Sequence, residues 1–365
     1  MDFSFSEEQE AVRDLARQIF EGRSTPERVR QVEGGADRFD RELWAELAKA
    51  NLLGISLPEG VGGSGLGLIE SLLVLEEAGR RVAPVPLWPT LFLGAFPVAE
   101  FGSDEQRSTR LPGVVEGEIV LTGAYEEFGA NDPLRSSVTA DDDRLTGEKP
   151  AVPAAHVAER VLVPAETDGV LSVFVVDPRG EGVTLDLDEA TNRQIHAEMT
   201  FAGASGERLG GDGAALVQWT LERAALGLCA LQVGVCESAL HATAEYTSHR
   251  EQFGRPLSTN QGVALRAADA YIDIEAMRAT LWAAAWRLTE GLPAAAEVAA
   301  AKWWASEGGH RVVHSTQHLH GGIGADIEYP LHRTFLWAKQ LAHTLGGPSQ
   351  QLARLGRILR EEAMA

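Results

Sequence analysis

The feature that most constrains the fold is the spacing of apolar residues in the C-terminal part of the chain. Leucine and alanine recur there every three to four residues in four long stretches joined by short loops, as on one face of a helix. The expected helices cover residues 213–249, 262–290, 294–319 and 329–363. Long helices with short connections pack antiparallel, so we expect a four-helix bundle at 211–365.

Two other segments precede this bundle. Residues 1–116 also show helical periodicity, and Ser6 is placed to cap the first helix. Residues 117–210 instead carry β-branched runs separated by turn residues, which is typical of strands about 4–6 residues long. We therefore expect an α+β, mainly α chain with an N-terminal helical domain, a middle β-barrel-like domain and a C-terminal four-helix bundle.

The glycine-rich segment 58–67 has two interpretations, a nucleotide-binding loop or a tight connection between helices. It follows an amphipathic helix rather than a buried strand, and no Lys-Ser or Lys-Thr comes after it. Both observations favour the connection.

Charge and composition exclude several classes of partner. The 365 residues include 53 acids and 32 Lys or Arg, a formal charge of −21. Nucleic acids and anionic membrane surfaces are bound by basic faces, so we expect neither as a partner. The N-terminus lacks the regions of a signal peptide, and no uncharged apolar run approaches the ~18 residues of a membrane span. Cys229 and Cys236 suit a buried core better than a disulfide framework, and we expect a cytoplasmic protein.

No metal is expected. Four histidines have partly helical spacing, but no acid or cysteine lies within reach by spacing to complete a ligand set. They are His310, His314, His318 and His320.

Two motifs at ends of bundle helices could bind a ligand. Arg250-Glu-Gln-Phe-Gly-Arg-Pro ends the first helix, and its arginine offers a fork of donors suited to a pyrophosphate. Phe253 could cover an adenine or pack at a dimer seam. Gln317-His-Leu-His-Gly-Gly-Ile-Gly ends the third helix, and its glycines let backbone N–H groups approach a phosphate. The alternatives are a surface ion pair with Glu251 and an ordinary helix-end turn.

These motifs and the order of the segments resemble the acyl-CoA dehydrogenase family. Three further stretches share the likeness, so that it covers essentially the whole chain: Asp2-Phe-Ser-Phe-Ser-Glu-Glu-Gln, the glycine segment from Leu57, and Leu145-Thr-Gly-Glu-Lys. The resemblance implies FAD bound between subunits, with the flavin ring on one chain's β domain and the adenosine end held by the neighbour. It also implies contacts to that FAD in trans from Arg250, Gln252, Phe253, Gln317 or His318, Gly321 and Gly322.

The catalytic base does not stand where the family resemblance places it. Much of the family carries a Glu in the last helical region, where this chain has Leu345 or Gly346, and no acid occurs from Tyr329 to Arg360. Other members carry the Glu early in the first bundle helix. Glu222 lies two residues before that position, about 200° around the helix. The sequence leaves the base unknown.

The expected platform for the flavin ring is also altered. The family's Leu-Thr-Glu-Pro and Gly-Ser-Asp elements are replaced within Leu121–Asp132. Where the family offers an aromatic and a hydroxyl to the flavin, this chain has Ala151 and Pro153. A proline provides neither a hydroxyl nor an N–H donor.

The trans-acting motifs are thus kept, while the base and the flavin platform are lost. This split resembles a subunit of the actinobacterial heterotetrameric acyl-CoA dehydrogenases of steroid side-chain breakdown, which would complete the FAD site of a homologous partner chain in an α2β2 assembly. The resemblance implies an acyl-CoA substrate and an electron-transfer flavoprotein as acceptor. The alternatives are a self-sufficient homotetramer that uses Glu222 and a flavin-free structural homologue.

Overall fold

The computed structural model describes residues 4–129, 132 and 134–364. Asp2 and Phe3 of the N-terminal motif and Ala130 and Asn131 of the altered platform lie outside the described residues. The predicted fold class is confirmed, because the chain is 58% helical, with helices before and after a barrel of strands. The predicted domain boundaries stay predictions.

Backbone contacts divide the chain into two compact units, each made of separate stretches of sequence. Unit 1 combines the chain up to Val29, Leu72–Ala83 and the chain from Ala225 onward. Unit 2 combines Arg30–Ser71 with Pro84–Ala224.

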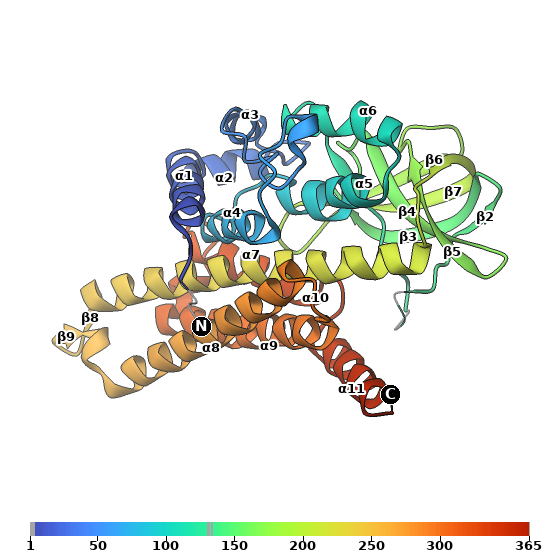
Figure 1. Cartoon of the computed structure of the whole chain (residues 1–365). Coiled ribbons are helices and arrows are strands. Elements are labelled where there is room, and N and C mark those ends of the chain that lie inside the picture. The colour runs from blue at the N-terminus through green and yellow to red at the C-terminus, as the bar shows by residue number, and fades with distance from the viewer. Residues whose placement is uncertain (1–3, 130–131, 133, 365) are drawn as a thin grey trace. The chain divides into compact units, whose positions relative to one another are not determined.

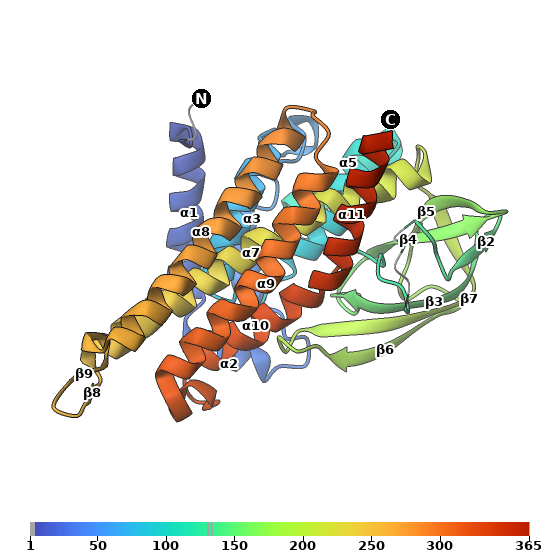
Figure 2. The same ribbon diagram turned by 90° about the horizontal axis from the view of Figure 1, so that it is seen from below.

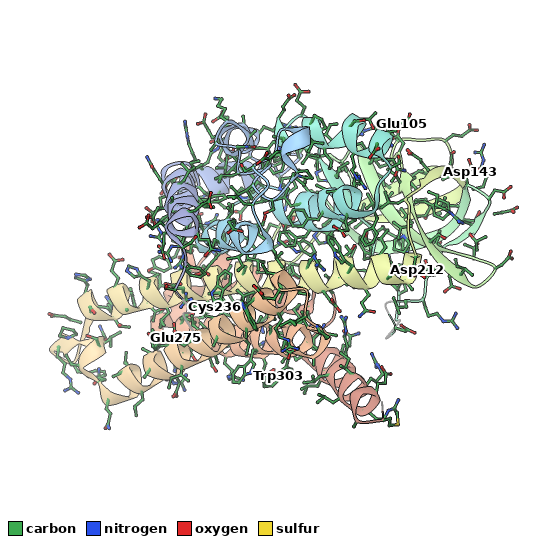
Figure 3. The ribbon with its side chains drawn as sticks, in the orientation of Figure 1. Glu105, Asp143, Asp212, Cys236, Glu275 and Trp303 are labelled. Carbon is green, nitrogen blue, oxygen red and sulfur yellow. The ribbon has the colours of Figure 1, made fainter. Side chains whose placement is uncertain are left out.

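Unit 1 is built around long helices that run side by side (Figures 1 and 2). They are the greater part of α7 (Gly213–His249), then α8 (Gln261–Thr289), α9 (Ala295–His320), α10 (Leu331–His343) and α11 (Pro348–Met364). Cys236 of α7, labelled in Figure 3, is fully buried, and both cysteines are free. The bounds of α7, α8 and α9 agree with the sequence prediction to within a residue.

The prediction of one helix over 329–363 is wrong. The helix breaks after His343, where Leu345 and Gly346 have φ of 57° and 95°, and α11 begins at Pro348. Proline has no backbone N–H to continue the hydrogen-bond ladder, and glycine accepts the left-handed conformation that ends a helix. Gln351 closes the break by donating from Nε2 to the carbonyl of Leu345 at 2.9 Å.

Helix α1 (Glu7–Arg23) and residues 72–80 of α4 (Leu68–Arg80) complete the helical part of unit 1, together with the start of α2 (Pro26–Glu33). Ser6 caps α1 as predicted, since its side chain accepts from the N–H of Gln9. Helices α4 and α7 cross so closely that a Cβ on Gly234 would lie 2.0 Å from the carbonyl oxygen of Glu76. Glycine is therefore required at this crossing.

Unit 2 begins with short helices and contains the glycine-rich segment. The helices are α3 (Arg41–Lys49), the first turn of α4, the π-helical η2 (Pro89–Ala95), α5 (Phe96–Phe101) and α6 (Asp104–Val115). The glycine segment connects α3 to α4, and the N–H groups of residues 62–66 all donate to backbone carbonyls of residues 54–59. Amides engaged in this way are not offered to a phosphate, which supports the connection between helices.

The strands of unit 2 close into a barrel. The closed circuit runs β4–β2–β3–β7–β5 and back to β4, with β1 added beside β4 and β6 beside β7. The strands are β1 (Leu121–Gly123), β2 (Thr139–Asp141), β3 (Arg144–Pro153), β4 (Arg160–Thr167), β5 (Val170–Val176), β6 (Val183–Glu189) and β7 (Ile195–Arg208). The predicted strand length of about 4–6 residues is wrong, because the strands of this sheet range from 3 residues in β1 and β2 to 14 in β7. Strand β7 is longest because β3 and β6 pair with its first part and β5 with its end.

Among the described residues, a single helix has the length and hydropathy of a possible membrane span. Helix α7 contains an 18-residue window that is apolar enough to cross a membrane, by length and composition only. Since 78% of that window is buried inside the protein, α7 fits the core helix of a folded domain.

Candidate functional site

The Arg250 motif forms a turn that projects from the end of α7. Strands β8 (Glu251–Gln252) and β9 (Arg255–Pro256) make a two-residue hairpin at the far end of α7 and α8 (Figure 2). Its turn residues, Phe253 and Gly254, have φ of 56° and 76°, the positive values that such a hairpin needs. The side chain of Phe253 is 97% exposed.

The polar groups of this hairpin face solvent. Arg250 is exposed and forms no ion pair with any residue that the structure describes, so the alternative pairing with Glu251 is not found. Its backbone is fixed, because its N–H donates to the carbonyl of Tyr246 at 2.8 Å and its carbonyl accepts from Leu257 at 2.9 Å. Gln252 donates from Nε2 to the carbonyl of Glu251 at 2.9 Å. A guanidinium on a fixed backbone with no counter-charge is suited to binding an anion.

The glycine loop after α9 presents an open backbone. Gly321 ends α9 with φ 66° and ψ −145°, and η4 (Gly321–Ala325) leads toward α10. A Cβ on Gly321 or Gly322 would meet nothing within 4 Å, whereas one on Gly324 would lie 2.9 Å from the carbonyl oxygen of Gln317. The first two glycines therefore leave room for a ligand, and Gly324 is needed for packing.

Gln317 and His318 differ in their surroundings. The side-chain oxygen of Gln317 is buried and accepts no hydrogen bond within the described chain. His318 is exposed. A buried acceptor without a partner costs free energy, so Gln317 is suited to accept from a bound molecule.

The two motifs come together through Tyr246, which the sequence analysis did not single out, and through its contact with His320. The ring of Tyr246, one turn before Arg250, stacks on His320, which directly precedes Gly321, with ring centroids 4.4 Å apart. An aromatic residue four positions before the arginine and an imidazole directly before the glycines were the available signals.

The position expected for the catalytic Glu carries no acid. Leu345 and Gly346 form the break between α10 and α11, and the buried Gln351 bonds both of their carbonyls. The sequence has no Asp or Glu from Tyr329 to Arg360, so this segment contributes no carboxylate.

Glu222 is buried near the start of α7, in unit 2. It is 9% exposed, and its Oε1 accepts from Nε2 of Gln218, one turn earlier, at 3.1 Å. Ala224, the position matched by spacing, is fully buried, and its carbonyl accepts from the Trp88 indole at 2.9 Å. Glu222 thus has a partner in its own helix.

The segments expected to carry the flavin ring are bonded to each other in unit 2. The Thr122 hydroxyl donates to the carbonyl of Pro153 at 2.7 Å. The ring of Tyr125 folds back so far that a Cβ on Gly123 would lie 2.3 Å from it. Burial raises the pKa of the Tyr125 hydroxyl, and the nearby Thr220 side chain opposes that shift. That hydroxyl nevertheless lacks a well-formed hydrogen bond among the described residues.

A buried ion pair also lies in unit 2. Lys149 of β3 is fully buried and pairs with Glu127, whose side chain is 8% exposed. Nζ of Lys149 also donates to the Ser136 hydroxyl at 3.0 Å. Burial lowers the pKa of Lys149, and the Glu127 carboxylate opposes that shift.

The described residues hold no group of three or more His, Cys, Asp or Glu side chains that could bind a metal. Of the four spaced histidines, His310 and His314 instead contact Lys339, whose Nζ lies 2.6 Å from Nδ1 of His310 and 2.8 Å from Nε2 of His314.

Comparison with known proteins gives two family matches. Residues 6–118 match the description "Acyl-CoA dehydrogenase, N-terminal domain" and residues 211–359 match "Acyl-CoA dehydrogenase, C-terminal domain". Proteins of this family are FAD-dependent flavoproteins.

Similar individual proteins cover almost the full chain. The acyl-CoA dehydrogenase FadE27 of Mycobacterium tuberculosis is 39% identical over 372 residues, 99% of both chains. A solved variant of the steroid ACAD Tcur3481–Tcur3483 has a TM-score of 0.94 and 48% identity, covering 98% of this chain and 99% of that one. The ChsE4–ChsE5 complex from Mycobacterium tuberculosis has a TM-score of 0.93 and 39% identity, covering 99% of each chain.

Proposed function

Since the chain belongs to the acyl-CoA dehydrogenase family, we propose that it is one subunit of an α2β2 acyl-CoA dehydrogenase and completes the FAD site of a homologous partner. The partner carries the catalytic carboxylate and supports the flavin ring. The single observation behind the proposal is a contrast between two parts of the chain. The Arg250 side chain and the Gly321–Gly322 backbone are accessible to a ligand, whereas the Tyr125 ring fills the space over Gly123 in the barrel.

The residues of unit 1 fit the adenosine end of FAD. Arg250 supplies an unpaired guanidinium for the pyrophosphate, and the open backbone at Gly321 and Gly322 lets N–H groups approach it. Gln317 offers a buried acceptor without a partner, and Phe253 an exposed aromatic face for an adenine. Gln252 and His318, both exposed, stand beside these groups in the sequence.

The residues of unit 2 do not fit the flavin ring. The Thr122 hydroxyl is already bonded to Pro153, and Tyr125 fills the space over Gly123. A flavin there would have to displace a buried aromatic ring, at a cost of the order of 3 kcal/mol or more. This chain therefore offers no platform of its own.

When bound, FAD would supply a hydride acceptor for the β carbon of an acyl-CoA, and a carboxylate of the partner would take the α proton, so that the product would be an α,β-unsaturated thioester. In the proposed complex this chain holds the adenosine end and supplies neither the base nor the ring contacts. By likeness to the steroid ACAD Tcur3481–Tcur3483, the substrate is the CoA thioester of a steroid side chain. An electron-transfer flavoprotein takes the electrons, and the two free, buried cysteines suit a cytoplasmic complex.

The test is flavin content with and without the partner. We expect no stable flavin in the lone chain and, when it is co-expressed with its homologue, about one flavin per two chains. Arg250→Ala should release that flavin, whereas Arg266→Ala, which removes an exposed arginine from α8, should not. Full flavin in the lone chain, together with turnover that Glu222→Gln abolishes, would instead establish the self-sufficient enzyme. An unchanged flavin content in the Arg250→Ala complex would favour a structural homologue.

A further inference from the structure

Three aromatic side chains pack together at the base of the glycine loop. Tyr246 of α7 stacks on His320 of α9 at 4.4 Å with the rings 18° from parallel. Tyr329, which follows the loop, lies 5.4 Å from His320 and 6.5 Å from Tyr246, centroid to centroid. His320 is only 4% exposed. We call Tyr246, His320 and Tyr329 the aromatic clamp.

Hydrogen bonds fix the tautomer of His320. Its Nδ1 lies 2.9 Å from the carbonyl oxygen of Thr316, which can only accept, so Nδ1 carries the proton. Nε2 is then an acceptor, and the Tyr329 hydroxyl donates to it at 3.3 Å. The Thr243 hydroxyl, 3.4 Å from Nδ1, donates to the carbonyl of Ala239 and leaves a lone pair toward the ring. Both nitrogens of the imidazole are therefore engaged.

The clamp joins the two motifs of the proposed cofactor site. The carbonyl of Tyr246 accepts from the N–H of Arg250, so the clamp fixes the last turn of α7. His320 directly precedes Gly321, and Tyr329 closes the other end of the same loop. One packed cluster thus sets the distance between the arginine and the glycine backbone.

We propose that His320 is a positioning residue, which acts through the aromatic clamp to hold the Gly321–Gly322 backbone and Arg250 at the spacing that binds the adenosine-diphosphate part of FAD. This inference rests on the proposed function. His320 itself does not touch the cofactor.

The physical reason is preorganisation. A loop that begins with two exposed glycines has high backbone entropy, and ordering it on binding would weaken affinity. The clamp orders both ends of the loop during folding. Burial lowers the pKa of His320, which keeps the ring neutral and its Nε2 free to accept from Tyr329 at neutral pH.

The test uses the complex with the partner chain. His320→Phe keeps a stacking ring and removes both hydrogen bonds, while Tyr329→Phe removes a single oxygen. We expect flavin to bind about 10-fold more weakly in His320→Phe and about 3-fold more weakly in Tyr329→Phe, the range of one to two hydrogen bonds. Amides 321–328 should exchange faster in both. The double variant should match His320→Phe alone, because the two residues act as a unit.

Two control variants remove the same groups elsewhere. Tyr271→Phe changes an exposed tyrosine of α8, and His241→Phe changes an exposed histidine of α7. Neither variant should alter flavin binding or the hydrogen exchange of the loop amides. Wild-type affinity and protection in both clamp variants, or strictly multiplicative effects in the double variant, would overturn the inference. If His320→Phe fails to fold, Tyr329→Phe and its control decide.

The exchange measurement separates this inference from the function on which it rests. Loop exchange can be followed in the chain without flavin. If Arg250→Ala leaves flavin bound, the proposed function fails, whatever the clamp does. If Arg250→Ala releases flavin while the clamp variants keep it, the clamp inference fails and the proposed function stands.

Discussion

At the scale of single residues, we expect the stability of the barrel to depend on the buried ion pair between Lys149 and Glu127. Lys149 is fully buried, and removing it would leave the Glu127 carboxylate buried with no cation. We expect Lys149→Met to lower the free energy of unfolding by about 3 kcal/mol, measured by urea denaturation. The exposed pair Lys49–Glu46 is the control, and Lys49→Met should change stability by less than about 0.5 kcal/mol. Equal effects would show that the buried pair is dispensable.

His196 of β7 makes the barrel sensitive to acid. Burial lowers its pKa to about 4, with the His156 charge adding to the shift and a backbone hydrogen bond at Ala151 opposing it. The unfolded chain, with an ordinary pKa of about 6.5, takes up the proton first, so this contribution is complete above that pH. It is lost as the pH falls toward about 4.

The measurement for His196 is the urea midpoint at a series of pH values. The wild-type midpoint should fall between pH 7 and 4, and His196→Gln should flatten that part of the curve. Parallel curves for the two proteins would mean that other groups cause the acid sensitivity.

At the scale of elements, the crossing of α4 and α7 depends on glycine. A Cβ on Gly234 would lie 2.0 Å from the carbonyl oxygen of Glu76, so the helices would have to separate. We expect Gly234→Ala to cost about 2–3 kcal/mol in a thermal or urea denaturation. Gly356→Ala on α11, where a Cβ meets nothing within 4 Å, should instead stabilise by about 0.5–1 kcal/mol. Equal melting temperatures for the two variants would contradict the close crossing.

The elements also show what sequence reasoning can predict. Helices α7, α8 and α9 carry their own apolar periodicity, which is why their bounds followed from sequence. The length of β7 depends on three partner strands that lie far away in the sequence, so the local pattern gave too short a strand. The break at Leu345 was missed because the apolar pattern continues across it, although Gly346, Gly347 and Pro348 signal it.

Some features of the candidate site could likewise be predicted from the sequence, and others could not. Arg250 and Gly321 were found because helix ends and glycines are visible in the sequence. The stacking of Tyr246 on His320 brings together residues 74 positions apart and needs the packed bundle. The same holds for the hydrogen bond from Thr122 to the carbonyl of Pro153, which joins residues 31 positions apart.

At the scale of the whole molecule, the exposed hairpin tip predicts how the chain assembles. Phe253 is 97% exposed, which is unusual for so large an apolar ring. We expect Phe253→Ser to leave the melting temperature of the lone chain unchanged but to weaken the complex and its flavin binding by about 10-fold or more. Analytical ultracentrifugation with flavin absorbance measures both. Leu265→Ser, which changes an exposed leucine of α8, is the comparison. A complex of full strength with serine at position 253 would place the interface elsewhere.

The same hairpin has a consequence for how the protein is made. A copy synthesised without its partner displays an aromatic side chain on a strained turn with nothing to cover it. Surplus copies would therefore be substrates for chaperones and proteases rather than a stored reserve. On this view the cell must match the synthesis of the two chains, and the scarcer one sets how much active complex accumulates.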